Sequence, residues 1–304
     1  MARIRTPWLS TAAVVLAATG LVWAGLVWAG SRSGSPRLQH FAGTADYLPG
    51  VAADLYLPPG HASTTPVVVL VPGGGWQTAD RRGLRPLADA LAGQGMVVVN
   101  ATYRAADSRA RFPQPVADIV CAIDYAADRA RRAGYRSGPL VVVGHSSGAH
   151  LASLAALGGS HFRGACPFPQ VQPDGFVGLA GPYDITKISD LAYPLFDASP
   201  AEAPAAWREG NPLTWVTART GAHPLRALLA AGDADAVVPP TLTTSFAAAL
   251  TRAGHPVRVV IVPGATHSTI YTPRVIGGTI ASWIEGWRAV GQTSSARASG
   301  TPGR

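Results

Sequence analysis

Short, mostly apolar runs recur along this chain, several of them rich in valine, and segments with helical spacing separate them. The runs lie at residues 65–71, 96–100, 140–143, 175–180, 225–231 and 257–262. A run that is apolar at every position is typical of a strand buried on both faces of a parallel sheet. Helical segments between such strands imply right-handed crossovers, so the sequence predicts an α/β domain with a mostly parallel central sheet and helices on both faces.

The segments around these units set the expected domain organisation. Residues 38–60 carry Leu-Pro-Gly and Pro-Pro-Gly breaks, which favour two short strands joined by a turn. Residues 183–224 hold no single period and carry prolines among aromatic residues, so we expect a cap-like insertion of short helices and loops. The α/β domain is expected at residues 38–290, followed by a disordered tail at 291–304, where glycine, serine and threonine dominate.

The N-terminal segment has the composition of a membrane anchor. Residues 8–30 contain no charged side chain and follow a basic N-terminus. A helix of this length would span about 34 Å, enough to cross the hydrocarbon core of a bilayer. We expect residues 1–37 to hold a retained anchor and a linker, with the basic end in the cytoplasm; a secretory signal that is cleaved is the alternative. In either case the body is exported.

The charge of the chain indicates which kinds of partner it could bind. The net charge of +8 comes almost wholly from arginine, since Lys187 is the only lysine. Basic clusters such as Arg129, Arg131 and Arg132 alternate with apolar residues, as on a solvated helix face, so no nucleic-acid site is predicted. Because the N-terminus is also basic, we expect the chain to be attracted to an anionic membrane surface rather than to a nucleic acid.

The chain has two cysteines, Cys121 and Cys166. They could form a disulfide in the oxidising compartment that export implies, but a buried thiol within a helix explains Cys121 equally well. Because no histidine or aspartate clusters with them in the sequence, no zinc site is predicted. We expect neither a metal nor a cofactor.

A Gly-x-Ser-x-Gly pattern joins the run 140–143 to a helical segment. Gly144 and Gly148 permit a tight strand-to-helix turn, which would expose Ser146 where the active crevice of a parallel sheet lies. The positive end of the following helix would lie beside the hydroxyl. We therefore predict that Ser146 is a nucleophile, against the alternative that it only caps this helix.

A serine nucleophile needs a base, and the base needs a carboxylate that holds its tautomer. His267 is the predicted base among eight histidines, because it directly follows the strand 257–262 and precedes the last helix. His145 adjoins the serine but is expected to point elsewhere on a tight turn. His150 falls within the helix that follows.

The carboxylate is expected after the strand 225–231, where the sequence offers Asp233 and Asp235. Asp233 can be explained as a turn residue, whereas Asp235 reaches further over the strand end and is preferred. Asp184 is a third candidate, after the preceding strand. With Asp235, the order along the chain is nucleophile, acid and base, as expected in this class of sheet.

Three consecutive glycines follow the strand 65–71 and let backbone amides approach a ligand closely. Such amides, with that of Ser147 at the start of the next helix, could bind a developing oxyanion. Trp76 directly follows the glycines and would line an acyl or alcohol pocket with aromatic residues of the insertion. Packing within the cap is the other explanation for those aromatic residues.

Over roughly residues 50–290 these motifs resemble the α/β-hydrolase superfamily, and within it esterases and lipases related to hormone-sensitive lipase and to bacterial feruloyl-esterase-like enzymes. The stretches PGGGW, GHSSGAHLA, AGPYD and GDADAVVP carry the resemblance. It implies an oxyanion hole formed by the amides of Gly74, Gly75 and Ser147, and it supports Asp235 as the acid. Pro72 replaces a histidine that usually steadies the glycine loop in these relatives.

We therefore expect a serine carboxylic-ester hydrolase that acts on a small-molecule ester through an acyl-enzyme. An exported peptidase or amidase could use the same three side chains. Kynurenine formamidases share much of this plan, but export of the body argues against that activity. A non-catalytic binding protein could also keep the fold, although such proteins usually lose one of the three residues.

Overall fold

The computed structural model describes residues 38–60, 62, 64–217 and 224–287. The expected anchor at residues 8–30, its linker and the expected tail at 291–304 lie outside the described residues. Within the described ranges, no helix combines the length and the apolar character that crossing a bilayer requires. These described residues belong to the compact unit Leu38–Arg304.

The central element is an eight-stranded sheet in the order β1-β2-β4-β3-β5-β6-β7-β8. The strands are β1 (Phe41–Leu48), β2 (Val51–Tyr56), β3 (Thr65–Val71), β4 (Val97–Ala101), β5 (Ser137–His145), β6 (Gly175–Leu179), β7 (Arg226–Gly232) and β8 (Val257–Val262). Only β1 with β2 and β2 with β4 pair antiparallel; the other described pairs are parallel. This confirms the predicted α/β class and the N-terminal hairpin.

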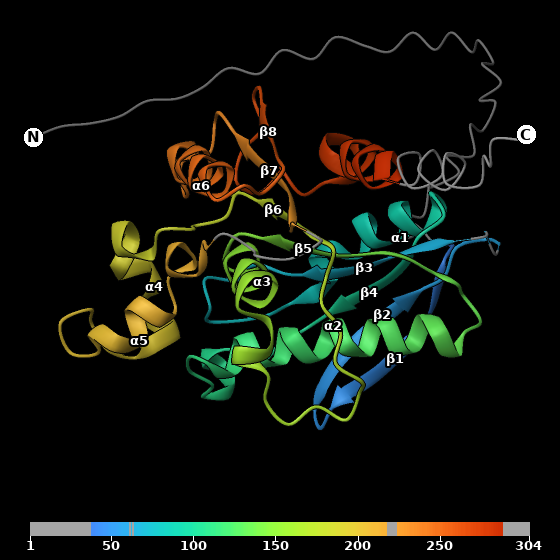
Figure 1. Ribbon diagram of the computed structural model, residues 1–304, viewed down its shortest axis with the longest axis horizontal. Helices are drawn as coiled ribbons and strands as arrows, with labels where there is room; N and C mark the ends of the chain where they lie inside the picture. The colour runs from blue at the N-terminus through green and yellow to red at the C-terminus, as the bar shows by residue number, and fades with distance from the viewer. Residues whose placement is uncertain (1–37, 61, 63, 218–223, 288–304) are drawn as a thin grey trace, which may run out of the picture. The chain divides into compact units, whose positions relative to one another are not determined.

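Helices cover both faces of the sheet (Figure 1). They are α1 (Arg85–Gly93), α2 (Gln114–Arg132), α3 (Ser147–Gly158), α4 (Ser189–Phe196), α5 (Pro204–Glu209), α6 (Pro240–Arg252) and a C-terminal helix at 278–287. Because strand side chains alternate between faces, Val67 and Val69 join the core with α2 and α3, whereas Val68 and Leu70 join the core with α1 and the C-terminal helix.

Two local details differ from the expected elements. Strand β5 begins at Ser137, earlier than the apolar run at 140–143, because its first residues pair with the start of β3. The expected last helix at 273–290 begins as a π-helix, Pro273–Gly277, before the regular helix at 278–287. In the part of the expected insertion that the structure describes, 183–217 and 224, the elements are all short: α4, α5 and the 3₁₀ helices η4 (Ile185–Ile188) and η5 (Pro212–Trp215).

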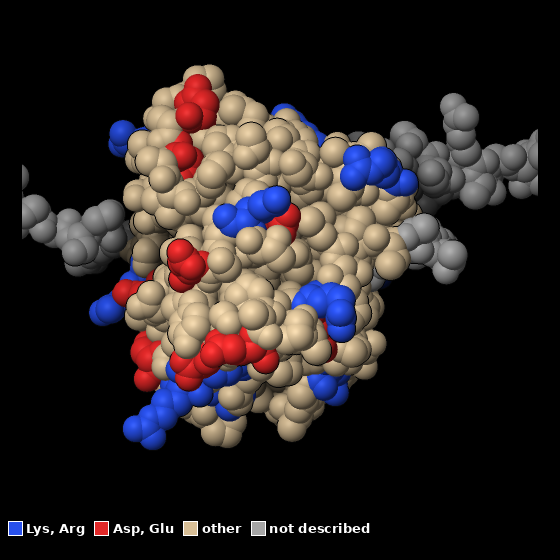
Figure 2. All heavy atoms as spheres, turned by 90° about the vertical axis from the view of Figure 1, so that its left-hand side faces the viewer, with Lys and Arg blue, Asp and Glu red and all other residues tan. Residues whose placement is uncertain are grey.

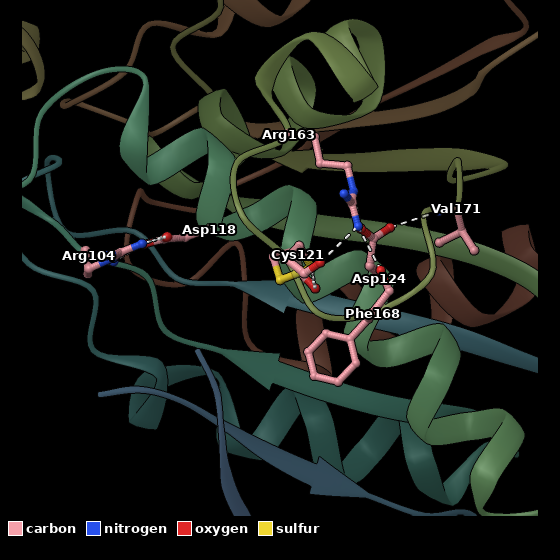
Figure 3. Close-up of a disulfide and its surroundings, with 8 residues drawn as sticks. Arg104, Asp118, Cys121, Asp124, Arg163, Phe168 and Val171 are labelled. Atoms are coloured by element: carbon pink, nitrogen blue, oxygen red, sulfur yellow. Dashed lines mark hydrogen bonds and ion pairs between the residues drawn. A yellow bond between two sulfur atoms is a disulfide. The ribbon is translucent and has the colours of Figure 1, made fainter. Parts of the chain in front are cut away.

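The two cysteines form a disulfide with an S–S distance of 2.10 Å (Figure 3). It ties α2 to the loop before β6. Beside it, the Arg163 guanidinium donates to Asp124 Oδ2 at 3.0 Å, and the Val171 amide donates to the other oxygen of Asp124 at 2.9 Å. The disulfide and the buried Asp124 carboxylate together hold this loop on α2.

Removing the disulfide is expected to lower stability without changing the fold. The bond closes a loop with a sequence separation of 45 residues. A loop of that length corresponds to about 4 kcal/mol of lost unfolded-chain entropy. The double variant Cys121→Ala/Cys166→Ala should therefore unfold at clearly lower urea concentration. Fully reduced wild type should match it, and an unchanged midpoint in both samples would contradict the expectation.

Charge is divided unevenly between the described residues and the rest of the chain. All 17 acidic residues lie among the described residues, which hold 17 of the 25 basic ones. The other eight are Arg3, Arg5, Arg32, Arg37, Arg219, Arg288, Arg297 and Arg304. On the face in Figure 2, basic and acidic side chains are interspersed across a mostly uncharged surface. The described residues carry equal numbers of basic and acidic side chains, so the net charge of +8 comes from residues outside them.

Candidate active site

Ser146 lies at a sharp turn between β5 and α3, with a φ of 54° and a ψ of −125°. A non-glycine residue in such a conformation stores backbone strain, which is commonest at functional sites. A Cβ at Gly144 would lie 2.3 Å from the Gly148 carbonyl oxygen, and one at Gly148 would lie 2.4 Å from the Pro72 carbonyl oxygen. Both flanking glycines are therefore required by close backbone packing, and this packing presses the turn against the end of β3.

The structure brings Ser146, His267 and Asp235 together beyond the carboxyl ends of three parallel strands, β5, β8 and β7. The Ser146 Oγ lies 2.9 Å from His267 Nε2, and His267 Nδ1 lies 2.9 Å from Asp235 Oδ2. The other Asp235 oxygen accepts hydrogen bonds from the amides of Val237 and Val238, each at 2.9 Å. This chain of contacts can pass the serine proton to the imidazole while the carboxylate holds the Nδ1–H tautomer.

The other two candidate carboxylates have structural partners of their own. Asp233 Oδ1 accepts from the Gly264 amide at 2.6 Å and so ties together two turns. Asp184 Oδ1 accepts from the Thr186 hydroxyl at 2.6 Å and from Asn211 Nδ2 at 3.2 Å. Neither contacts His267. The geometry therefore agrees with the preference for Asp235.

The glycine loop lies directly against the serine. A Cβ at Gly73 would lie 2.9 Å from the Ser146 Cβ, so the loop can approach this closely only because no side chain is present there. Gly74 and Gly75 have φ values of 147° and 61°. Within the described residues, the amides of Gly74, Gly75 and Ser147 donate no hydrogen bond, so all three keep their capacity to bind an oxyanion.

Trp76 is buried and does not face a pocket. Its side chain is only 1% exposed, and its indole N–H donates to His150 Nδ1 at 3.2 Å. The prediction that it lines a substrate pocket is therefore wrong, because the ring is buried beneath the glycine loop. The indole instead fixes the loop to α3.

The aromatic residues of the insertion mostly pack against one another. Phe196 and Trp207 stack with ring centroids 4.4 Å apart, and the indole N–H of Trp207 donates to a backbone carbonyl of the insertion. A cavity of about 320 Å³ lies between the insertion and α6, and Leu213, Tyr183 and Phe246 are among its lining residues. No tryptophan lines this cavity. Packing within the insertion thus explains the tryptophans better than a pocket does.

His145, which directly precedes the serine, supports the loop of His267. Its Nε2–H donates to the His267 carbonyl oxygen at 2.9 Å, and its ring packs on those of His267 and Tyr271 at 4.9 and 4.4 Å. Burial lowers the pKa of this imidazole to about 4, so it stays neutral near pH 7. The expectation that His145 points away from the site is therefore wrong, and its position next to Ser146 is the only signal in the sequence for this contact.

The buried histidines should make stability depend on pH in a defined window. Burial lowers the pKa of both His145 and His150 to about 4, against 6.5 for an exposed imidazole. Below pH 6.5 the unfolded chain binds protons that the folded chain cannot accept. Stability is therefore complete above pH 6.5 and falls toward pH 4, by up to about 3 kcal/mol for each imidazole.

Urea unfolding of wild type at pH 7.0, 5.5 and 4.5 measures this dependence. His150→Gln removes one titrating group, so the fall in unfolding free energy should be smaller in that variant. Equal stability of wild type at pH 7.0 and 4.5 would show that the two imidazoles are not held neutral.

Esterases are among the solved structures that this fold resembles. A truncated carbohydrate esterase from gut microbiota superposes with a TM-score of 0.70 at 19% identity, covering 81% of this chain and 96% of that one. Thermogutta terrifontis esterase 2 phosphorylated by paraoxon has a TM-score of 0.59 at 23% identity, covering 76% and 85%. At these identities the likeness establishes the α/β-hydrolase fold.

Sequence relatives carry esterase names and are longer than this chain. Esterase LipQ of Mycobacterium tuberculosis (strain ATCC 25618 / H37Rv) is 28% identical over 261 residues, 77% of this chain and 59% of LipQ. The probable carboxylic ester hydrolase LipM of the same organism is 30% identical over 135 residues, 43% of this chain and 31% of LipM. The chain thus spans between about a third and three fifths of the length of these relatives. The BD-FAE family model matches residues 53–250, more than half of the chain, so this chain belongs to the BD-FAE family.

Proposed function

We propose that the chain is a serine carboxylic-ester hydrolase. The observation that carries the proposal is the geometry at Ser146, whose hydroxyl lies 2.9 Å from an imidazole that is itself held by Asp235. The esterase names of the relatives agree with this chemistry. A small-molecule ester is the proposed substrate.

In the proposed mechanism, His267 Nε2 takes the proton from Ser146 Oγ as the oxygen attacks the ester carbonyl carbon. Asp235 stabilises the imidazolium that forms. The amides of Gly74, Gly75 and Ser147 donate to the oxyanion. The imidazolium then protonates the departing alcohol, which leaves an acyl group on Ser146. A water molecule, deprotonated by the same imidazole, releases the acid and restores the serine.

Turnover of nitrophenyl esters from acetyl to palmitoyl, compared with peptide anilides, tests this proposal on the full chain. We expect ester hydrolysis with an optimum at one chain length and little cleavage of the anilides. Faster cleavage of the anilides would instead identify a peptidase or amidase. A folded protein without either activity would favour the binding-protein alternative.

We also propose that the body is exported and held at the membrane by residues 1–37. The uncharged stretch at 8–30 and its basic flanks support this location. The Cys121–Cys166 disulfide also supports it, because such bonds persist in oxidising compartments. Fractionation of cells that express the full chain should place it with the membranes, whereas a chain that begins at residue 38 should remain in the soluble fraction.

A further inference from the structure

His150 is completely buried in the first turn of α3, four residues after the proposed nucleophile. Both of its ring nitrogens have partners, and these belong to two different segments. Nδ1 lies 3.2 Å from the indole nitrogen of Trp76, and Nε2 lies 2.8 Å from the carbonyl oxygen of Gly210. The imidazole therefore connects the glycine loop on one side with the insertion on the other.

The two partners fix the protonation of the ring. An indole N–H can only donate, so Nδ1 accepts, and a carbonyl oxygen can only accept, so Nε2 carries the hydrogen. A single neutral tautomer satisfies both contacts. Burial also lowers the pKa of His150 to about 4, which keeps this tautomer in place near neutral pH.

On the side of the glycine loop, Trp76 sits where its backbone can direct the proposed oxyanion donors. It directly follows Gly75 and has a φ of 58°. The Gly74 carbonyl accepts from the amides of Gln77 and Thr78, which closes a turn around it. The Trp76 and His150 rings are also nearly perpendicular, with centroids 5.2 Å apart and planes at 86°. Because Trp76 directly follows Gly75, movement of the indole would move the amide of Gly75.

On the side of the insertion, Gly210 directly follows α5 and has little freedom to move. Its amide donates to the Ala206 carbonyl, and a Cβ at this position would lie 2.6 Å from the Phe196 ring. The next residue, Asn211, donates to Asp184 Oδ1 at 3.2 Å, which ties the segment to the loop after β6. The hydrogen bond from His150 thus holds an ordered part of the insertion.

We propose that His150 is a positioning residue that couples the insertion to the oxyanion loop. Nδ1 holds the indole of Trp76, so that the amides of Gly74 and Gly75 point at the developing oxyanion. Nε2–H holds Gly210, so that the insertion keeps its place beside α3. The inference rests on the proposed ester hydrolysis and adds to it a residue that touches no substrate. Oxyanion donors act only when they are preorganised, so the loss of this link should reduce turnover more than substrate binding.

Three variants distinguish the effects of the two hydrogen bonds of His150, one to Trp76 and one to Gly210. His150→Gln keeps a side-chain donor near the position of Nε2 but loses the acceptor for Trp76. Trp76→Phe removes the indole donor from the other side. Both should lower kcat by roughly 10- to 100-fold with little change in KM, somewhat less than the loss of an oxyanion donor itself. His150→Asn keeps an acceptor near Nδ1 and loses the donor to Gly210, so it should affect KM more than kcat.

The affinity for a trifluoromethyl ketone distinguishes a positioning role from a purely structural one. This inhibitor forms a tetrahedral oxyanion on the serine, so its affinity depends on the oxyanion donors. In His150→Gln and Trp76→Phe, this affinity should fall by the same factor as kcat/KM. The double variant should be no worse than the poorer single variant, because both changes break one link. Ser153→Ala is a matched control, since its hydroxyl donates only to the His150 carbonyl, at 2.7 Å, and it should keep the wild-type kcat.

Thermal melting establishes which variants are folded, and Trp76→Phe carries the test if His150→Gln does not fold. Wild-type kcat and inhibitor affinity in a folded Trp76→Phe or His150→Gln would overturn the role of His150. The proposed ester hydrolysis would still stand if wild type is active and Ser146→Ala is not. An inactive wild type would instead refute the proposed function before any His150 variant is compared.

Discussion

Ser146→Ala is expected to lower kcat for ester hydrolysis by about 10⁶-fold, because removal of a serine nucleophile leaves only the contribution of the oxyanion donors and binding. No other described hydroxyl contacts His267. The fold should survive the change. Alanine meets the same backbone strain as serine at a φ of 54°, and it fits within the volume that serine occupies. Single-turnover and steady-state assays on purified protein, with thermal melting for the fold, measure both expectations.

Ser108→Ala is the matched control for the loss of a serine hydroxyl. Its Oγ donates to the Ala105 carbonyl at 2.9 Å, and this exposed side chain contacts none of Ser146, Asp235 and His267. It should keep wild-type turnover. If Ser146→Ala retained more than about a thousandth of the wild-type kcat, a different nucleophile would have to be sought.

The sheet and the three side chains at its edge could be predicted because they depend on local patterns. The apolar runs 65–71 and 140–143 are buried on both faces of the parallel part of the sheet, as predicted. The run 257–262 pairs parallel to β7 as expected, but it forms the edge strand β8, where Val259 and Ile261 are exposed. Polar residues that directly follow such strands meet at one edge. Ser146 and His267 therefore lie in hydrogen-bond contact although 121 residues separate them.

The contacts that support this edge could not be predicted, because they join segments for which the sequence shows no common pattern. An aromatic residue beside three glycines is equally compatible with lining a pocket and with packing inward. Trp76 packs inward because α3 presents His150 as an acceptor 74 positions further along the chain. His145 likewise holds the His267 loop through a backbone carbonyl, and a carbonyl is present at every residue.

Asp235→Asn is expected to lower kcat by about 10⁴-fold, because the amide would hold the imidazole in the wrong tautomer. The orientation of that amide follows from the structure. Oδ1 of Asp235 accepts from two backbone amides, those of Val237 and Val238, each at 2.9 Å. The amide oxygen of asparagine would take this position, so its NH₂ group would face His267 Nδ1. The imidazole would then carry its hydrogen on Nε2 and could not accept the proton of Ser146.

Asp233→Asn tests which of the two neighbouring carboxylates, Asp233 or Asp235, acts as the acid of the proposed site. Asp233 Oδ1 accepts from the Gly264 amide at 2.6 Å, and asparagine keeps an oxygen that can accept the same bond. Turnover of this variant should stay within about threefold of wild type, as is usual for a surface substitution of similar shape. A larger loss of kcat in Asp233→Asn than in Asp235→Asn would identify Asp233 as the acid. Equal, small losses in both variants would mean that the base needs no carboxylate, and that backbone packing on His145 alone sets the orientation of the His267 ring.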